Sequence, residues 1–493
     1  MSQARTIWIT LGLMLFLVVL PLALRESTNQ MPNTNARRLV IYTPHSESIR
    51  REFAEAFAEY WEKQHKEKVY IDWRSPGGTS EIRLVLDASY KAADEEKRPG
   101  IGADIFFGGG EPDFANQSKK GRLVPLKLFD KHPEWFGKDG AIPEIYTGER
   151  LYAKDKTWIS SCLSRFGICY NPIRLKYLDL PEPKTWNELM NPKLYGMIAL
   201  ADPTKSGSVA RAFELIVQAE MQKSLNDPAL KDLPEKERLA RGWKNGLKVL
   251  QGLAANARYF ADASTKIPLD IADGNAVAGM CVDYYGKAFA NQVNKTEVRL
   301  KWIAPINGTT VSGDPIAVLR GTSEPELAQA FVEYVLSPEG QALWNSAAGT
   351  PGGPKRRELY RPPVRRDTFP IGTGKPAPDS PYVFGEYQTY RPELTAASFG
   401  TLRRFVRVMC IDNHEELKSA WQAIIEAGMP ADAIAALQDF SSLPYRDGGK
   451  GDPELDNPDP LVSAQRMSQL GIKFRENYKR AEALARAHTS KKP

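Results

Sequence analysis

The sequence has few cysteines, and none of them forms a CxxC pair. Zinc ribbons and dithiol redox centres use cysteines at that close spacing, so neither is expected. An exported protein can carry disulfides. Cys162 and Cys169 are too far apart on one expected strand to be joined. Two alternatives stay open: a disulfide from Cys162 or Cys169 to Cys281, or cysteines that are buried free thiols. The four cysteines in 493 residues are Cys162, Cys169, Cys281 and Cys410.

The chain also lacks a strong charge imbalance and a second long apolar run. Its net charge of +6 is spread over 493 residues, so no nucleic-acid partner is expected. The one long run without charge is Ile7–Leu24, which makes residues 1–25 a signal peptide or a membrane anchor. No small-x-small cleavage site precedes Arg25 and no lipoprotein cysteine follows the run. We expect a periplasmic or extracellular protein, either released or held at the inner membrane by this segment.

No P-loop, HExxH motif or nucleophile elbow is found in the sequence. These absences favour a binding protein over an enzyme. The enzyme alternative would use Asp283, His45 and Glu111 for acid–base chemistry.

Strand and helix patterns alternate through most of the chain. After a tether at residues 26–37, short apolar runs and amphipathic stretches predict a βαβαβ unit with parallel strands. A second α/β region follows Trp158. The segment from Thr350 to about Ser380 is rich in Pro and Gly, and its basic part, Lys355–Arg366, is expected to be a solvated loop. Helical periodicity returns from residue 385.

The stretch Ala276–Gly286 combines a buried strand with an unusual polar end. Its apolar part is followed by Asp283, Tyr284 and Tyr285. Ligand sites in open α/β sheets lie at such strand ends. Neighbours on a strand point to opposite faces, so both phenols can face one ligand only if the chain turns, which Gly286 permits.

Several motifs occur in an order and spacing that resemble a known family. Residues 38–348 resemble the type II periplasmic solute-binding proteins of ABC importers, nearest to the ferric-ion-binding branch. The motifs are Tyr42 with His45, Gly102–Phe107 with Glu111, Phe166–Asn171 with Pro183 and Trp186, Ala199–Gly207, Tyr284-Tyr285, and Phe331–Gly340.

The resemblance implies an α/β fold of two doubly wound lobes joined by a two-strand hinge, with a ligand between the lobes. The crossing strands would lie near Ser161–Ile168 and Val277–Asp283. The last residues add a C-terminal helical extension outside the usual pattern. The division is then lobe 1 at 38–157 and 284–350, lobe 2 at 158–283, a linker at 351–384 and the extension at 385–493.

The resemblance also implies a site for Fe³⁺ with a synergistic anion. Tyr284, Tyr285, Glu111 and His45 would hold the metal, and hard oxygen donors suit this hard cation. Residues Ser206, Gly207 and Ser208 open a helix and would hold the anion, because free backbone N–H groups point from a helix start. Two further residues are expected as ligand contacts: Thr79 and Asp283.

Two alternatives to iron delivery remain. Lys205, Lys266 and Arg74 lie near expected cleft turns, and several cations there would favour an organic anion such as a phosphate ester or phosphonate. In either case the partner is an ABC permease in the inner membrane. The second alternative is a membrane-anchored sensor whose C-terminal helices meet a partner, against a simpler role in which these helices pack on a lobe.

Overall fold

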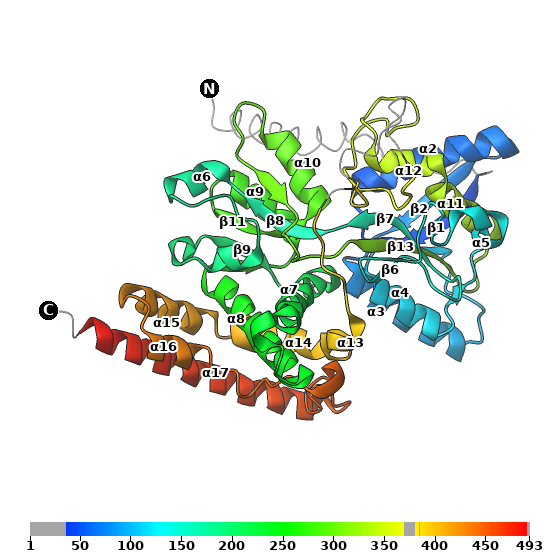
Figure 1. Cartoon of the computed structure of the whole chain (residues 1–493). Coiled ribbons are helices and arrows are strands. Elements are labelled where there is room, and N and C mark those ends of the chain that lie inside the picture. Colours follow the sequence, from blue (N-terminus) through cyan, green and yellow to red (C-terminus); the bar gives the residue numbers. More distant parts are fainter. Residues whose placement is uncertain (1–35, 369–379, 384, 491–493) are drawn as a thin grey trace, which may run out of the picture.

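The computed structural model describes residues 36–368, 380–383 and 385–490. Two α/β units lie side by side, and a layer of C-terminal helices lies along one of them (Figure 1). The predicted signal or anchor, residues 1–25, falls outside the described residues. Among those that are described, no helix combines the length and apolar character needed to cross a membrane.

The first unit, which we call lobe 1, is built on a mixed sheet. Its strand order is β2–β1–β3–β13–β4, with β7 also paired to β13. β1 pairs in parallel with β2 and β3, whereas β13 is antiparallel to its partners. The strands are β1 (Arg37–Tyr42), β2 (Val69–Arg74), β3 (Ile105–Phe107), β4 (Leu123–Val124), β7 (Ile159–Ser164) and β13 (Ser312–Leu319), with a separate hairpin of β5 (Ile145–Tyr146) and β6 (Glu149–Arg150).

The helices of lobe 1 follow the apolar spacing of the sequence. In α2 the buried residues Ile49, Phe53, Phe57 and Trp61 recur at steps of four, so one face packs on the sheet. The helices are α2 (Glu47–His65), α3 (Thr79–Glu95), α4 (Glu111–Lys119), α5 (Leu128–Lys131), α11 (Pro325–Leu336) and α12 (Pro338–Asn345), with a 3₁₀ turn, η1, at Pro133–Trp135.

The second unit, lobe 2, has a sheet with the order β10–β9–β11–β8–β12. β11 lies inside this sheet, parallel to β9 and antiparallel to β8. The strands are β8 (Phe166–Tyr170), β9 (Ile198–Ala201), β10 (Ala257–Ala261), β11 (Ala278–Val282) and β12 (Lys301–Ile303). The helices are α6 (Pro172–Tyr177), α7 (Gly207–Asn226), α8 (Glu235–Ala255), α9 (Ile267–Ala272) and α10 (Asp283–Val293), with 3₁₀ turns η2 (Trp186–Met190), η3 (Pro192–Leu194), η4 (Pro228–Leu230) and η5 (Ser264–Lys266).

The connections between the lobes differ from the prediction. The first crossing is confirmed: β7 pairs in the first sheet, β8 pairs in the second, and Arg165 alone separates them. The second was predicted at Val277–Asp283, which is wrong because β11 is hydrogen-bonded within lobe 2. The chain returns to lobe 1 between β12 and β13. The predicted start of lobe 1 at residue 284 is therefore too early, since α10 and β12 belong to lobe 2.

A later segment accompanies the second crossing. The N–H of Asn307 donates to the carbonyl of Glu386 at 3.0 Å, and the N–H of Gln388 donates to the carbonyl of Thr309 at 3.1 Å. The N–H of Tyr390 then donates to the carbonyl of Thr147 in the β5–β6 hairpin. Residues 385–391 thus contact both lobes before they enter the C-terminal helices.

The C-terminal extension packs on lobe 2. Its apolar residues form one continuous core with those of lobe 2, and the indole of Trp243 donates to the carbonyl of Leu443 at 2.9 Å. This arrangement matches the simpler of the two roles predicted for these helices. They are α13 (Pro392–Thr395), α14 (Phe399–Val406), α15 (His414–Glu426), α16 (Ala431–Leu437) and α17 (Pro460–Thr489), with η6 (Ala396–Ser398), a π-helical turn η7 (Arg407–Ile411) and η8 (Asp447–Gly449).

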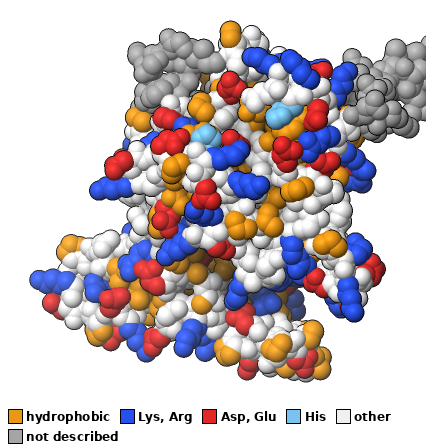
Figure 2. Space-filling view, turned by 90° about the vertical axis from the view of Figure 1, so that its right-hand side faces the viewer, with side chains coloured by type: hydrophobic (Ala, Val, Ile, Leu, Met, Phe, Trp, Pro, Cys, Tyr) orange, Lys and Arg blue, Asp and Glu red, His pale blue; other side chains and the backbone are white. Residues whose placement is uncertain are grey.

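The basic segment Lys355–Arg366 is only partly a solvated loop. Arg361 and Arg365 are 2% and 5% exposed, which contradicts the prediction for these two residues. Elsewhere the surface matches the mild net charge: on the face in Figure 2, acidic and basic side chains are interspersed.

Candidate functional site

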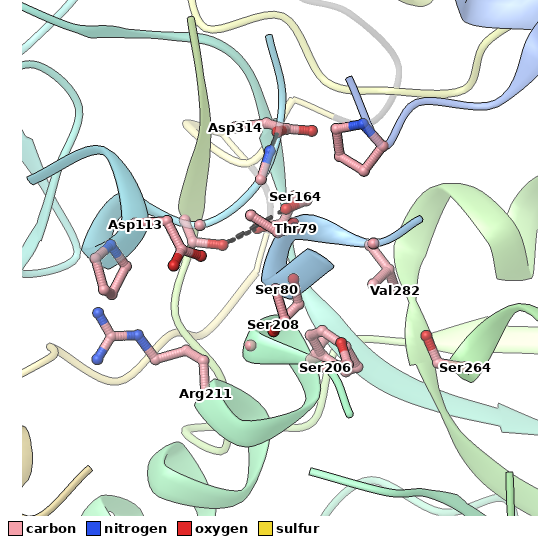
Figure 3. A pocket seen from close by; sticks show the side chains of 18 of the residues that line it. Thr79, Ser80, Asp113, Ser164, Ser206, Ser208, Arg211, Ser264, Val282 and Asp314 are labelled. Atoms are coloured by element: carbon pink, nitrogen blue, oxygen red, sulfur yellow. Dashed lines mark hydrogen bonds between the residues drawn. The ribbon is translucent and has the colours of Figure 1, made fainter. Parts of the chain in front are cut away.

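A cleft of about 800 Å³ lies between the lobes. Both lobes line it, and so does the extension through α14. Figure 3 shows side chains from several elements around this space, with Asp314 on one side, Ser206 and Ser208 on the opposite side, and Arg211 and Asp113 together at one end. The cleft is where the sequence predicted a ligand.

Two helix starts border the cleft, one from each lobe. Thr79 begins α3 in lobe 1, and Gly207 begins α7 in lobe 2. The Ser206 hydroxyl accepts from the N–H of Val209 at 3.3 Å and so caps α7. The first turns of both helices carry N–H groups without intrahelical partners, and both positive dipole ends favour an anion.

A glycine turn holds the start of α3 against β3. Gly109 has φ +133°, and a Cβ there would lie 2.5 Å from Cγ2 of Thr79. Only glycine accommodates both this conformation and this close approach. All four residues predicted to bind an anion or ligand at the helix starts, Thr79 and Ser206–Ser208, line the cleft; their contact with a ligand stays a prediction.

The tyrosine pair stands at a helix start and not at a strand end. α10 begins at Asp283, so Tyr284 and Tyr285 lie on its first turn, about 100° apart around the axis. Their ring centroids are 4.0 Å apart, and their hydroxyl groups hydrogen-bond to each other. Burial raises the pKa of both phenols. The two side chains therefore share one wall of the cleft without a turn at the next residue.

The role predicted for Gly286 is accordingly different. It lies inside α10, and a Cβ at this position would lie 2.5 Å from Cδ1 of Trp302. The glycine allows helix α10 to pack closely on β12.

Asp314 is the centre of a buried charged cluster beside the tyrosines. It accepts from the N–H of Gly109, from Nε2 of His45 at 3.1 Å and from Nη2 of Arg361. Burial alone would raise the pKa of Asp314, but the charge of Arg361 and the bonds from His45 and Gly109 hold it well below its usual range. Asp314 is ionised at neutral pH, so Nε2 of His45 must carry the donated proton.

His45 and Arg361 are fixed by the same cluster. Burial lowers the pKa of His45, and its ring packs edge-on against Phe107 at 4.5 Å. The Arg361 guanidinium lies over the Tyr284 ring, 4.4 Å from its centroid. Its Nε and Nη1 are buried and have no hydrogen-bond partner in the described part of the chain. Arg361 lines the cleft, so these two N–H-bearing nitrogens are candidate donors for a ligand, while its Nη2 stays paired with Asp314.

Glu111 belongs to another part of the cleft. Burial raises the pKa of Glu111, and its strongest charged neighbours are Arg211 and Glu149. The charges acting on Tyr285, by contrast, are those of Arg361 and Asp314. The four predicted metal ligands thus all line the cleft, yet His45 is already bonded to Asp314 and Glu111 faces a different set of charges.

Asp283 does not line the cleft. It is fully buried and accepts from Nε of Arg165 at 3.0 Å, while Oδ1 accepts from the N–H of Tyr284 at 2.9 Å. The prediction that it contacts a ligand is wrong for this structure: it joins the first crossing to the start of α10. Lys205, which does line the cleft, is paired with Asp262.

Sequence reasoning missed many of the residues that line the cleft, among them the charged residues Asp314, Arg361 and Arg403. A charged residue within the apolar strand Ser312–Leu319 was a usable signal for Asp314. No local pattern marks Arg361 or Arg403, because they reach the cleft from far along the chain.

Residues 102–369 match the model of a family described as bacterial extracellular solute-binding protein. The chain belongs to this family. The match covers more than half of the sequence and includes both crossings between the lobes. As a member of this family it is an extracytoplasmic solute-binding protein of the ABC-transporter type.

Two relatives align with part of this chain. An uncharacterized protein of Haemophilus influenzae is 26% identical over 315 residues, which cover 63% of this chain and 76% of that protein. The phosphoglycerate transport regulatory protein PgtC of Salmonella typhimurium is 25% identical over 187 residues. That alignment spans 38% of this chain and only 40% of PgtC.

Three similar structures support the fold of this solute-binding protein. AfuA from Actinobacillus pleuropneumoniae, solved with fructose-6-phosphate, has a TM-score of 0.52 at 18% identity, covering 78% of this chain and 97% of AfuA. A substrate-binding protein of an ABC transporter from Agrobacterium tumefaciens has a TM-score of 0.53 at 16% identity, and the alignment covers 79% of this chain and 95% of that protein. Apo ferric ion-binding protein A from Pasteurella haemolytica has a TM-score of 0.51 at 13% identity, and the alignment covers 77% of this chain and 98% of that protein. The predicted type II periplasmic fold is confirmed.

Proposed function

We propose that this protein captures a small phosphorylated organic anion in the interlobe cleft and delivers it to an ABC permease in the inner membrane. The proposal rests mainly on the buried side chain of Arg361. Its guanidinium is buried beside the cleft, and two of its nitrogens have no partner in the described residues. A buried donor without a partner costs free energy, and a phosphoryl oxygen is a strong acceptor for a guanidinium.

The helix starts supply the rest of an anion site. Thr79 and Ser80 stand at α3, and Ser206, Gly207 and Ser208 stand at α7 on the opposite lobe. A phosphate between them would join the two lobes, so ligand binding would favour the closed arrangement. Closure would occur by rotation at the crossing segments, so the hinge would comprise Arg165, residues 304–311 and the accompanying segment 385–391.

Two of the similar proteins are linked by name to this ligand class, whereas the similar protein from Pasteurella haemolytica is a ferric ion-binding protein. AfuA was solved with fructose-6-phosphate, and PgtC is named for phosphoglycerate transport. Both compounds are phosphate monoesters of small polar molecules. We therefore favour the phosphate ester, which the sequence suggested as the alternative to iron.

Isothermal titration of the purified protein tests this proposal. We expect 3-phosphoglycerate or a sugar phosphate to bind with a Kd near or below about 1 μM, since a phosphate held by several charge-assisted bonds supports affinities on the order of −8 kcal/mol. Arg361→Gln should weaken binding at least about tenfold. Arg356→Gln is the matched control, because Arg356 is exposed and pairs with Glu55 on the outer surface.

Fe³⁺ is the second candidate, and the tyrosine pair is the observation that favours it. The hydrogen-bonded phenols of Tyr284 and Tyr285 could both turn to one metal as phenolates. Against it, the guanidinium of Arg361 lies directly on the Tyr284 ring and would repel a trivalent cation. Titration with ferric citrate separates the two: iron on the tyrosines must give a visible tyrosinate charge-transfer band, and Tyr285→Phe must weaken it.

We also propose a periplasmic location with residues 1–25 as signal or anchor, and a role as binding protein and not enzyme. The acid–base enzyme suggested as an alternative would need free carboxyl and imidazole groups. Asp283 is paired with Arg165, and His45 is bonded to Asp314. The sensor alternative shares the same cleft and differs in the partner that receives the closed form.

A further inference from the structure

Helix α14 of the C-terminal extension reaches the ligand cleft. Phe399 and Arg403 from this helix are among the lining residues. Both lie beyond residue 369, where the family match ends. The extension is therefore more than a support for lobe 2, because one wall of the cleft is made by residues that the matched family region does not contain.

Arg403 is held at the cleft by the loop before α7. Its Nε donates to the carbonyl of Pro203 at 2.9 Å, and its Nη2 donates to the carbonyl of Thr204 at 2.8 Å. In the described part of the chain Nη1 has no protein partner. The two bonds fix the plane of the guanidinium close to Ser206, so the group is pre-organised and loses little freedom on meeting a ligand.

A second arginine faces Arg403 from the other lobe. Arg83 of α3 also lines the cleft and pairs with Asp113 at 3.4 Å. Burial lowers the pKa of Arg403, and the positive charge of Arg83 lowers it further. The positive charges of both arginines act to lower the pKa of Asp113, against the larger effect of burial, which raises it. The carboxylates of Asp113 and Asp202 both act on Arg403, and the geometry that favours a ligand here is the wall position of Arg403, whose guanidinium is held by two carbonyls.

We propose that Arg403 of the extension, together with Arg83, binds a second anionic group of the ligand. This inference rests on the proposed function, since the phosphate would occupy the helix starts and Arg361. The ligand class is then a phosphate ester that also carries a carboxylate. A ligand carboxylate that accepts from Arg403 and from Arg83 would join residues of opposite lobes by charge-assisted hydrogen bonds and hold the closed form.

The choice between ligands can be measured with two matched probes. 3-Phosphoglycerate and glycerol 3-phosphate differ in having a carboxylate or a hydroxymethyl group at one end. Isothermal titration of the full chain should give wild type a preference of about tenfold or more for 3-phosphoglycerate, the usual effect of one charge-assisted pair. Arg403→Ala should reduce the ratio of the two affinities to about one.

Two further variants keep the test decisive. Arg83→Gln should lower the same ratio from lobe 1, without touching the loop at Pro203 and Thr204. Arg404→Ala is the control on the same helix: Arg404 pairs with Asp456 and does not line the cleft, so both affinities should stay unchanged.

The possible results distinguish a failure of the role of Arg403 from a failure of the proposed phosphate-ester binding. If Arg403→Ala weakens both esters equally, Arg403 only supports the loop and the inference is overturned. Equal binding of both esters by wild type would overturn it as well. If neither ester binds to wild type, the proposed function fails and the inference fails with it.

Discussion

The ion pair of Arg361 with Asp314 allows a quantitative test on the protein without ligand. Both side chains are almost fully buried, at 3% and 9% exposure. Removing one partner of a buried pair costs about 3–5 kcal/mol, because the other charge stays buried without compensation. Arg361→Met should therefore destabilise the protein by about this amount, since the bonds from His45 and Gly109 do not neutralise the Asp314 carboxylate.

The expected change in unfolding temperature follows from the chain length. At about 2.1 cal/mol/K per residue, 493 residues unfold with an entropy of about 1 kcal/mol/K. Arg361→Met should then lower Tm by about 3–5 °C. In the double variant Arg361→Met with Asp314→Asn, both charges are gone, and the loss should be smaller than for Arg361→Met alone.

Thermal unfolding followed by circular dichroism measures the four proteins of this cycle. Arg356→Met is the control, because its own side chain is exposed, its partner Glu55 is only half-buried, and such surface pairs contribute about 0–1 kcal/mol. Additive losses in the double variant, or a loss for Arg361→Met as small as that of the control, would show that the Arg361–Asp314 pair does not contribute this stability.

Three other predictions concern separate residues. The folded-state pKa of Asp113, raised by burial to about 6, exceeds the unfolded value, so its ionisation costs stability as the pH rises from about 4 through 6. Asp113→Asn should therefore stabilise by up to about 3 kcal/mol at pH 8 and by little at pH 4 in urea unfolding; equal effects at both would contradict this. Gly109→Ala should weaken phosphate-ester binding in titration by displacing Thr79, and unchanged affinity would exclude this close contact as important. The sulfurs of Cys169 and Cys281 lie 2.7 Å apart, so oxidation should join them and protect both from alkylation after unfolding without reductant, whereas full labelling would argue against the pair.

Much of the fold was predictable because it depends on local patterns. The helix at Glu47–His65 follows from its apolar steps, and β11 from an uncharged run. The second crossing was misplaced because a buried strand has the same composition whether it ends a sheet or lies inside one. Only the pairing of β11 with β8 and β9 decides the matter, and pairing partners are not encoded near the strand.

The candidate site was predictable where it uses helix starts. Ser206–Ser208 and Thr79 stand where glycine and small polar residues precede apolar helices, and they line the cleft as expected. Asp283 was misjudged because a polar residue at a strand end can serve a buried ion pair as well as a ligand. Arg361 reaches Asp314 over a long sequence separation, so only the folded chain shows that this arginine is buried at the site.

The central claim is that a phosphate ester binds between the two helix starts and Arg361. A crystal structure of the full chain with 3-phosphoglycerate tests it most directly. We expect phosphoryl oxygens within hydrogen-bonding distance of the N–H groups at Ser206–Ser208 and of the Arg361 guanidinium. A ligand found outside the cleft, or an iron atom held by Tyr284 and Tyr285 with the helix starts unused, would contradict it.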